Sequence, residues 1–143
     1  MIVLDTNVLS EVMRPRPDPK LVSWLAVQPT ASLFIAAITQ AEILYGLALL
    51  PEGRRRIDLL AAASSMFAED FAGRILPFDG DAAVAYATIA TDRRQAGRPI
   101  SQFDAQIAAI VRSRGGLLAT RNTRDFIDCG FEIIDPWQAA QTS

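Results

Sequence analysis

The segment that decides the fold is Ile2-Val3-Leu4-Asp5-Thr6-Asn7-Val8-Leu9. Its opening run of apolar, partly β-branched residues is typical of a short strand buried on both faces of a parallel sheet. Thr6 or Asn7 is a suitable N-cap for a helix over residues 8–13, because both side chains accept hydrogen bonds from helix N–H groups. A strand followed at once by a helix is the start of an α/β unit. Asp5 then lies at the carboxyl end of that strand.

The same alternation continues along the chain. Short apolar runs that predict strands are followed by longer segments with helical periodicity. The further predicted strands are 33–35, 74–77, 117–120 and 132–134, and the further predicted helices are 20–27, 39–50, 53–71 with a break near its end, 79–97 and 102–114. This order predicts one α/β domain over residues 1–143, in which a mostly parallel central sheet lies between two layers of helices.

Composition limits the chemistry. The chain has 143 residues, of which half are hydrophobic and 21% are charged, and this suits one domain with a substantial core. It has no histidine and one cysteine, Cys129, which excludes Ser-His-Asp and Cys-His hydrolases and the usual zinc sites. The net charge of −2 means that any nucleic-acid binding needs a local basic patch. Neither a signal peptide nor a membrane-spanning run is visible, so we expect a cytoplasmic protein.

Oxygen-bearing side chains follow several of the predicted strands. Asp5 ends the first strand, and Glu42 lies in the first turn of the helix after the second. Asp104 lies in the first turn of a later helix, while Asn122 and Asp125 follow the fourth strand. Ligands of open parallel sheets bind beyond the carboxyl ends of the strands, so we expect these groups to share one rim. Oxygen ligands without histidine or cysteine favour Mg²⁺, with Mn²⁺ as the alternative.

Each acid also has a purely structural interpretation. Asp5 could cap the following helix, and Glu42 could be the capping-box partner of Thr39. Asp104 could be a first-turn acid favoured by the helix dipole, and Asp125 could cap a turn. Taken singly, these interpretations compete with a functional one. Several carboxylates on one rim would repel one another unless a cation neutralised them, so their joint placement is what indicates a metal site.

Four further motifs complete a family pattern. They are ITQAEILYG at 38–46, GRPISQFDAQIAA at 97–109, ATRNTRDF at 119–126 and DPW at 135–137. Together with residues 2–9, and in this order, they resemble the motifs of PIN-domain nucleases. Within that family the chain most resembles the VapC and FitB toxins of bacterial toxin–antitoxin pairs.

The resemblance implies a three-layer PIN-like fold and a metal-dependent endoribonuclease that uses a metal-activated water. Asp5, Glu42 and Asp104 match the acidic Mg²⁺-site residues of the family. Asp125 is the fourth catalytic candidate, although some members carry the fourth acid at the position of Asn122. This last position is therefore open between the two.

The resemblance also implies supporting residues and partners. Thr6 or Asn7 would orient the first carboxylate or a water at the metal. The substrate would be structured RNA, above all tRNA. The protein would form a homodimer and would be held inactive by a cognate antitoxin, through which alone it would meet operator DNA.

Arginines flank the predicted rim. Lys20 is the one lysine among 14 basic residues, and arginine favours bidentate contacts with phosphates. An arginine-rich genome composition is the alternative interpretation. The candidates for RNA binding are Arg14, Arg16, Arg98, Arg121 and Arg124.

Two other functions compete with the nuclease hypothesis. A phosphatase with Asp5 as its nucleophile would need a second acid at position 7, where this chain has Asn7, and a lysine other than Lys20. A catalytically inert PIN scaffold that binds protein or RNA is the second alternative. The complete set of acids argues against that scaffold.

Overall fold

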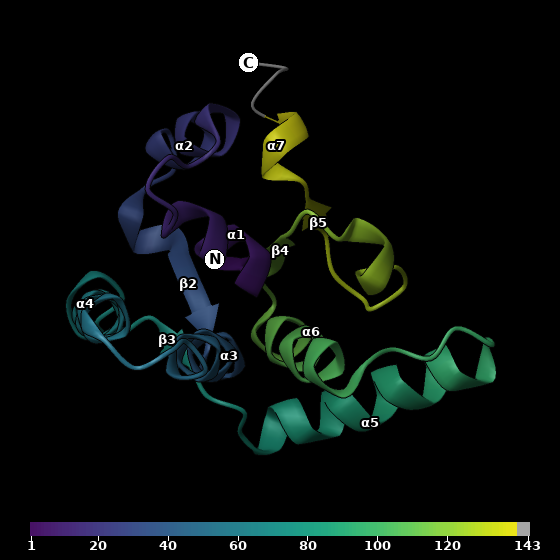
Figure 1. The fold of residues 1–143 in the computed structure, drawn as a ribbon. Coiled ribbons are helices and arrows are strands. Elements are labelled where there is room, and N and C mark those ends of the chain that lie inside the picture. The colour runs from purple at the N-terminus through teal and green to yellow at the C-terminus, as the bar shows by residue number, and fades with distance from the viewer. Residues whose placement is uncertain (140–143) are drawn as a thin grey trace.

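A sheet of five parallel strands runs through the centre of the fold, in the order β3-β2-β1-β4-β5 (Figure 1). The computed structural model describes residues 1–139. The strands are β1 (Ile2–Leu4), β2 (Leu33–Ala36), β3 (Ile75–Leu76), β4 (Leu117–Ala119) and β5 (Ile133–Ile134). The predicted mostly parallel sheet is therefore confirmed.

Helices cover both faces of this sheet, as predicted for a three-layer α/β/α domain (Figure 1). The helices are α1 (Thr6–Val12), α2 (Pro19–Ala26), α3 (Ala37–Ala48), α4 (Arg54–Ser65), α5 (Gly80–Gln95), α6 (Gln102–Arg114) and α7 (Pro136–Ala139). Short turns of other helical types are η1 (Thr30–Ser32), η2 (Met66–Asp70) and η3 (Thr123–Phe126). None of the described helices is long and apolar enough to cross a membrane.

The two faces of the sheet are built from alternate residues of the strands, because successive side chains of a strand point to opposite sides. Val3 and Leu118 pack with α5 and α6 in one core. Leu4 and Ala119, the next residues along the same strands, pack with α1, α2 and α4 in the other. Both cores therefore depend on one register between β1 and β4, in which Val3 pairs with Leu118 and Leu4 with Ala119.

Several helix ends are as predicted. Ser101 caps α6 by accepting a hydrogen bond from the Asp104 N–H at 3.2 Å. Asp79 caps α5 in the same way through the Ala82 N–H. The predicted helix 53–71 is interrupted where expected, since α4 ends at Ser65 and continues as the wider turn η2.

Three predictions about the first helices are wrong. Asp5, and neither Thr6 nor Asn7, is the N-cap of α1. Helix α3 begins directly from β2 at Ala37, so Thr39 is an interior residue whose buried hydroxyl bonds Thr6 and caps nothing. The same early start moves Glu42 from the predicted first turn into the second turn of α3. The Thr6 and Thr39 hydroxyls contact each other, and Thr6 donates to Glu42, so these groups join α1 to α3 and do not cap their own helices.

The strand order places a crevice between β1 and β4. Strands β2 and β3 lie on one side of β1, whereas β4 and β5 lie on the other, so the winding reverses there. Ligands of doubly wound sheets bind at such a switch point. The Asp5 N–H donates to the Ala119 carbonyl at 2.9 Å, which fixes Asp5 at the mouth of this crevice.

Leu118→Ala tests the core that forms around the paired strands β1 and β4. Leu118 is fully buried in the centre of the sheet, and we expect truncation to lower the free energy of unfolding by about 2–5 kcal/mol. Urea denaturation measures this change. Val27→Ala is the matched control, because Val27 is 76% exposed and should change stability by roughly 0.5 kcal/mol or less. Equal effects of the two substitutions would contradict the assigned core.

Candidate active site

Asp5 is a buried carboxylate held by three donors. The Thr6 N–H donates to its Oδ1 at 2.8 Å. Its Oδ2 accepts from the Thr120 hydroxyl at 2.7 Å and from Asn7 Nδ2 at 3.1 Å. Only 4% of Asp5 is exposed. Its orientation is therefore set by α1 on one side and by the end of β4 on the other.

The Thr120 hydroxyl links Asp5 to the segment after β4. While it donates to Asp5, its oxygen accepts from Asn7 Nδ2 and from the Asn122 N–H, both at 3.1 Å. Asn7 Oδ1 in turn accepts from the Arg121 N–H at 3.1 Å. This set of bonds ties the start of α1 to the residues just before η3, and within it Asn7 donates to the Asp5 carboxylate.

Glu42 joins the site through a pair of threonines. The Thr6 hydroxyl donates to Glu42 Oε1 at 2.8 Å and lies 3.0 Å from the Thr39 hydroxyl. Since Thr6 has a single hydroxyl proton and gives it to the carboxylate, Thr39 is the donor to Thr6. Helix α3 therefore delivers Glu42 to the same rim as Asp5, with Thr6 between them.

Asp104 and Asp125 complete the rim from two further elements. Asp104 lies in the first turn of α6, and its charge raises the pKa of Asp5. Asp125 lies in η3, and its charge raises the pKa of Asp104. The predicted acids thus act on one another as a chain of charges from Glu42 through Asp5 and Asp104 to Asp125.

Residues 2–132 match the PIN domain family. The chain belongs to the PIN-domain family. Among its curated relatives is the VapC ribonuclease Y4jK of Sinorhizobium fredii, which is 40% identical over 98% of this chain and 100% of the relative. The tRNA(fMet)-specific endonuclease VapC of Shigella flexneri is 30% identical over 94% of this chain and 96% of the relative.

A solved structure of FitAB bound to a DNA fragment has the same fold, with a TM-score of 0.90. Its matched chain is 38% identical over 96% of this chain and 96% of that chain. The chain is therefore a PIN domain of the VapC ribonuclease toxin family, a family of endoribonucleases, and its structural neighbours include complexes of toxin with antitoxin.

Burial raises the pKa of Asp5 in this PIN domain from its ordinary value of 3.8 to about 6. The hydrogen bonds from Thr120 and Thr6 oppose this shift, while the charges of Asp104 and Glu42 add to it. Burial is also the main reason that the pKa of Asp104 is raised. A carboxylate that is costly to ionise in the free protein gains most from a neighbouring cation, so these electrostatics suit a metal site.

The donor chemistry of the rim also fits a hard cation, since all of its candidate ligands are oxygens. Within residues 1–139, however, no three acidic or cysteine side chains converge closely enough to form a complete set of ligands. The buried Asp5 is the fixed member, held by three hydrogen bonds. Asp104 is half-buried and Asp125 is exposed, so both lie nearer to solvent than Asp5 does.

Three of the predicted RNA-binding arginines have partners within the protein. Arg14 pairs with Glu11 at 3.2 Å, and Arg98 pairs with Asp128 at 2.6 Å. The Arg121 guanidinium lies over the Trp137 ring, 4.9 Å from its centroid. Arg16 and Arg124 are exposed, and Arg124 lines a hollow formed by residues 121–125.

Sequence reasoning misses three residues that shape the site. The local pattern indicates a cap at Thr39 and only a strand end at Thr120, although both hydroxyls bond site residues. Arg93 is only 6% exposed and binds the segment that carries Asp125. The spacing of Arg93 from the buried Ala82 and Ile89, by 11 and 4 residues, follows the inner face of α5 and could have indicated its burial.

The raised pKa of Asp5 predicts a particular dependence of stability on pH in metal-free protein. Between pH 4 and 6 the folded state binds more protons at Asp5 than the unfolded state does, so this group stabilises the fold below pH 4 and the stabilisation is lost as the pH rises through 6. The loss amounts to at most about 3 kcal/mol.

Urea denaturation in EDTA between pH 4 and 7 measures this dependence. Relative to Asp5→Asn, which cannot ionise at this position, the wild type should lose stability steadily over that range. Parallel stability curves for the two proteins would show that Asp5 has an ordinary pKa.

Proposed function

We propose that this PIN domain is a metal-dependent endoribonuclease toxin that cleaves structured RNA, tRNA above all, and that a cognate antitoxin inhibits it. The observation that carries the proposal is the buried Asp5 at the switch point of the sheet, whose pKa is raised mainly by burial and further by the charges of Asp104 and Glu42. The four acids come from four separate elements. Because neighbouring carboxylates repel one another, their grouping lowers the stability of the fold, and folding alone does not account for it.

Each residue has a distinct task in this proposal. Asp5, Glu42 and Asp104 hold the cation, Mg²⁺ or Mn²⁺, and Asp125 is the fourth acid. When bound, such an ion lowers the pKa of a water and stabilises charge on the scissile phosphate. Asn7 and Thr120 keep the Asp5 carboxylate in one orientation by donating to Oδ2. Thr6 holds the Glu42 carboxylate in the same way.

The structure gives no support to the alternative of a phosphatase with Asp5 as its nucleophile. Both oxygens of Asp5 are engaged as acceptors, and its neighbour Asn7 donates to it where an acid would be needed. An inert scaffold would not need a buried carboxylate that repels its neighbours. Hydrolysis by water at a cation needs neither a protein nucleophile nor a histidine, and the chain lacks histidine.

One relative is named a tRNA(fMet)-specific endonuclease, and this name supports tRNA as the substrate in our proposal. Because tRNA is found in the cytoplasm, the proposal also places the protein there. The exposed Arg124 and Arg16 are the candidates for phosphate contacts that have no ion pair among the described residues. Arg14, Arg98 and Arg121 would have to exchange or share their present partners to bind RNA.

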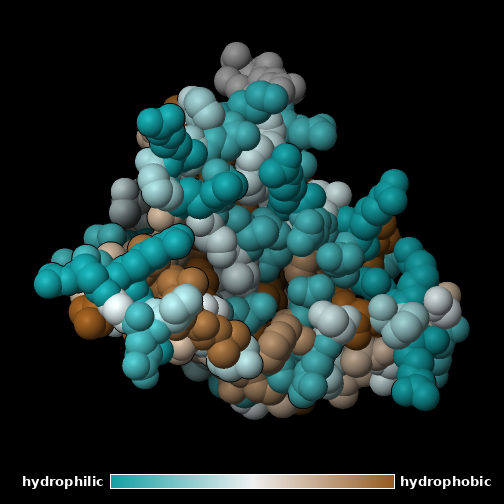
Figure 2. All heavy atoms as spheres, viewed as in Figure 1, coloured by the Kyte–Doolittle hydropathy of each residue, from teal (hydrophilic) through white to brown (hydrophobic). Residues whose placement is uncertain are grey.

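For the antitoxin, a groove of about 610 Å³ between α1, α3 and α4 supports docking beside the site. Thr6 and Glu42 lie in its wall, together with Leu47, Leu59 and Arg55. Figure 2 shows apolar side chains gathered over α3 and α4 on a face that is otherwise mostly hydrophilic. An inhibitor in this groove would lie against Glu42. Operator DNA would be bound through the antitoxin, and the solved FitAB complex with a DNA fragment supports that arrangement.

A homodimer is part of the same proposal. Tyr45 on α3 and Leu49, which follows the last residue of α3, are 67% and 66% exposed, and Val84 on α5 is 71% exposed. Exposed apolar side chains on these helices favour burial against another protein surface. A second copy of the chain is the occupant that the proposal assigns to them.

Cleavage of total tRNA by the purified protein tests the proposed activity. We expect discrete fragments with Mg²⁺ or Mn²⁺ and none with EDTA. Asp5→Asn, Glu42→Gln and Asp104→Asn should each lose cleavage while remaining folded by circular dichroism, because each removes one negative ligand from the cation. Asp58→Asn is the matched control, since Asp58 lies exposed on α4, and it should cleave normally. Retained cleavage in all three site variants would refute the proposal.

A comparison of Asp125→Asn with Asn122→Ala decides which residue is the fourth acid. The charge of Asp125 acts on Asp104, whereas Asn122 meets the site through its main chain, by its N–H to the Thr120 hydroxyl and by its carbonyl to the Asp125 N–H. We therefore expect Asp125→Asn to lower the rate of tRNA cleavage by about 10-fold or more and Asn122→Ala to have little effect. The opposite ranking would assign the position to Asn122.

A further inference from the structure

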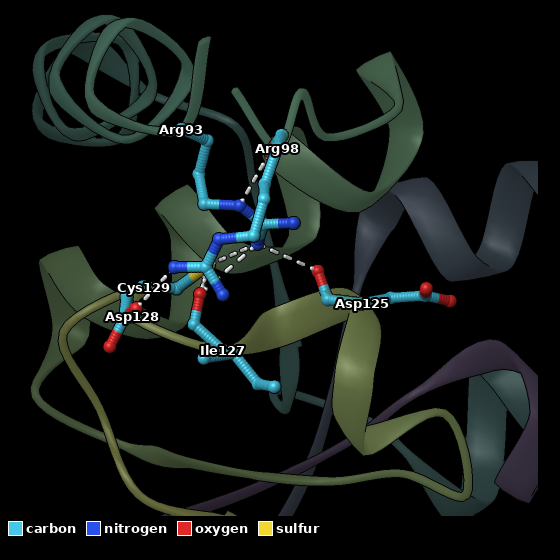
Figure 3. Close-up of polar contacts among 6 residues, drawn as sticks. All are labelled: Arg93, Arg98, Asp125, Ile127, Asp128 and Cys129. Carbon is cyan, nitrogen blue, oxygen red and sulfur yellow. Dashed lines mark hydrogen bonds and ion pairs between the residues drawn. The ribbon is translucent and has the colours of Figure 1, made fainter. Parts of the chain in front are cut away.

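Arg93 is a buried cation near the end of α5, only 6% exposed. Its guanidinium reaches across to the segment after η3 (Figure 3). Nε donates to the Arg98 carbonyl at 2.8 Å, and Nη1 donates to the carbonyls of Asp125 and Ile127 at 3.0 and 3.1 Å. Nη1 also lies 3.7 Å from the sulfur of Cys129.

These contacts are unusual because they include no carboxylate. Among residues 1–139, none of the ion pairs within 4.0 Å involves Arg93. A buried charge is costly unless it is well hydrogen-bonded, and arginine remains protonated in proteins. Main-chain carbonyl dipoles therefore provide the hydrogen-bond partners of this cation, and its charge acts on Asp104, whose pKa it lowers.

The carbonyls that Arg93 binds belong to two segments that each carry an acid. Arg98 lies in the loop before α6, whose first turn holds Asp104. Asp125 belongs to η3, and Arg93 binds it through its main chain only. Figure 3 shows the Asp125 carboxylate pointing away from the guanidinium. Arg93 thus fixes the Asp125 backbone without neutralising its side chain.

A second contact holds residues 125–129 from the solvent side. The Arg98 guanidinium pairs with Asp128 at 2.6 Å, and Asp128 has a left-handed backbone with φ of 61° (Figure 3). That conformation is uncommon for a residue with a side chain, so surrounding contacts must maintain it. Arg93 from within and Arg98 from outside therefore hold the turn over residues 125–129 in one shape.

We propose that Arg93 is a positioning residue of the nuclease, which holds residues 125–129 against the start of α6 so that Asp104 and Asp125 face one cation. This inference rests on the proposed function, in which both acids serve the metal. The planar guanidinium suits the role because its donors point in fixed directions and can reach several carbonyls at once. Lysine offers a charge at this position without that geometry.

Two variants with a matched control test the role. Arg93→Met keeps much of the length and removes the charge and all donors. Arg93→Lys keeps the charge alone. Arg94→Met makes the same change one residue along α5 at an exposed position. For each protein, hydrogen–deuterium exchange reports on residues 122–129, and Mn²⁺ titration followed by electron paramagnetic resonance reports on the metal, both without any RNA.

We expect Arg93→Met to raise the exchange of residues 122–129 while residues 2–12 and 37–48 remain protected as in the wild type. Its Mn²⁺ dissociation constant should rise about 10-fold, which is typical for the loss of a residue that orients metal ligands. Arg93→Lys should recover part of the affinity. When tRNA cleavage is measured at limiting Mn²⁺, Arg93→Met should lower kcat. Excess Mn²⁺ should make this decrease in kcat smaller.

Three results would overturn the inference. The first is unchanged exchange in both Arg93 variants. The second is faster exchange of residues 122–129 together with an unchanged Mn²⁺ dissociation constant, which would leave Arg93 a purely structural role. The third, should Arg93→Met not fold, is Arg93→Lys behaving like Arg94→Met in both measurements. If wild-type protein binds Mn²⁺ but cleaves no RNA, the proposed nuclease function fails while the exchange and affinity measurements still decide the role of Arg93.

Discussion

The fixed orientation of the buried Asp5 carboxylate is the constraint on which the rest of the site depends. Asp5 ends the central strand, caps the first helix and accepts from Thr120 at the end of the neighbouring strand. A single carboxylate thereby links strand pairing, helix capping and the acidic rim. Its burial costs stability in the free protein, because its charge is poorly solvated and repelled by other acids. Such strain is typical of functional sites, where local stability is exchanged for chemistry.

Glu42 and Asp125 are held in two different ways. Glu42 is held by a side-chain bond from Thr6, so its carboxylate is aimed at the rim. Asp125 is held through its main chain, by Arg93 and by the Asn122 carbonyl, and its side chain is exposed. The rim is therefore partly organised before any ligand binds.

The fold could be predicted from the sequence, because it follows from short-range patterns. Apolar runs predict strands, and side chains after parallel strands meet at one edge, which predicts a common rim for Asp5, Glu42 and Asp104. Their role as a metal site stays a prediction. The hydrogen bonds of the site could not be predicted. Thr39 has the local pattern of a cap, but its partner Thr6 is 33 residues away, and helix α3 starts earlier than propensity indicates. The role of Arg93 likewise depends on carbonyls 32 and 34 residues further along the chain.

The hydrogen bond between Asp5 and Thr120 spans 115 residues, and it has a consequence for synthesis of the protein. The central strand β1 is made well before β4, the strand that completes its crevice. A truncated or still-growing chain therefore has no assembled site, however well its first half folds. In the proposed toxin function, a nascent chain that has not yet reached β4 therefore lacks the assembled site and would not cleave RNA.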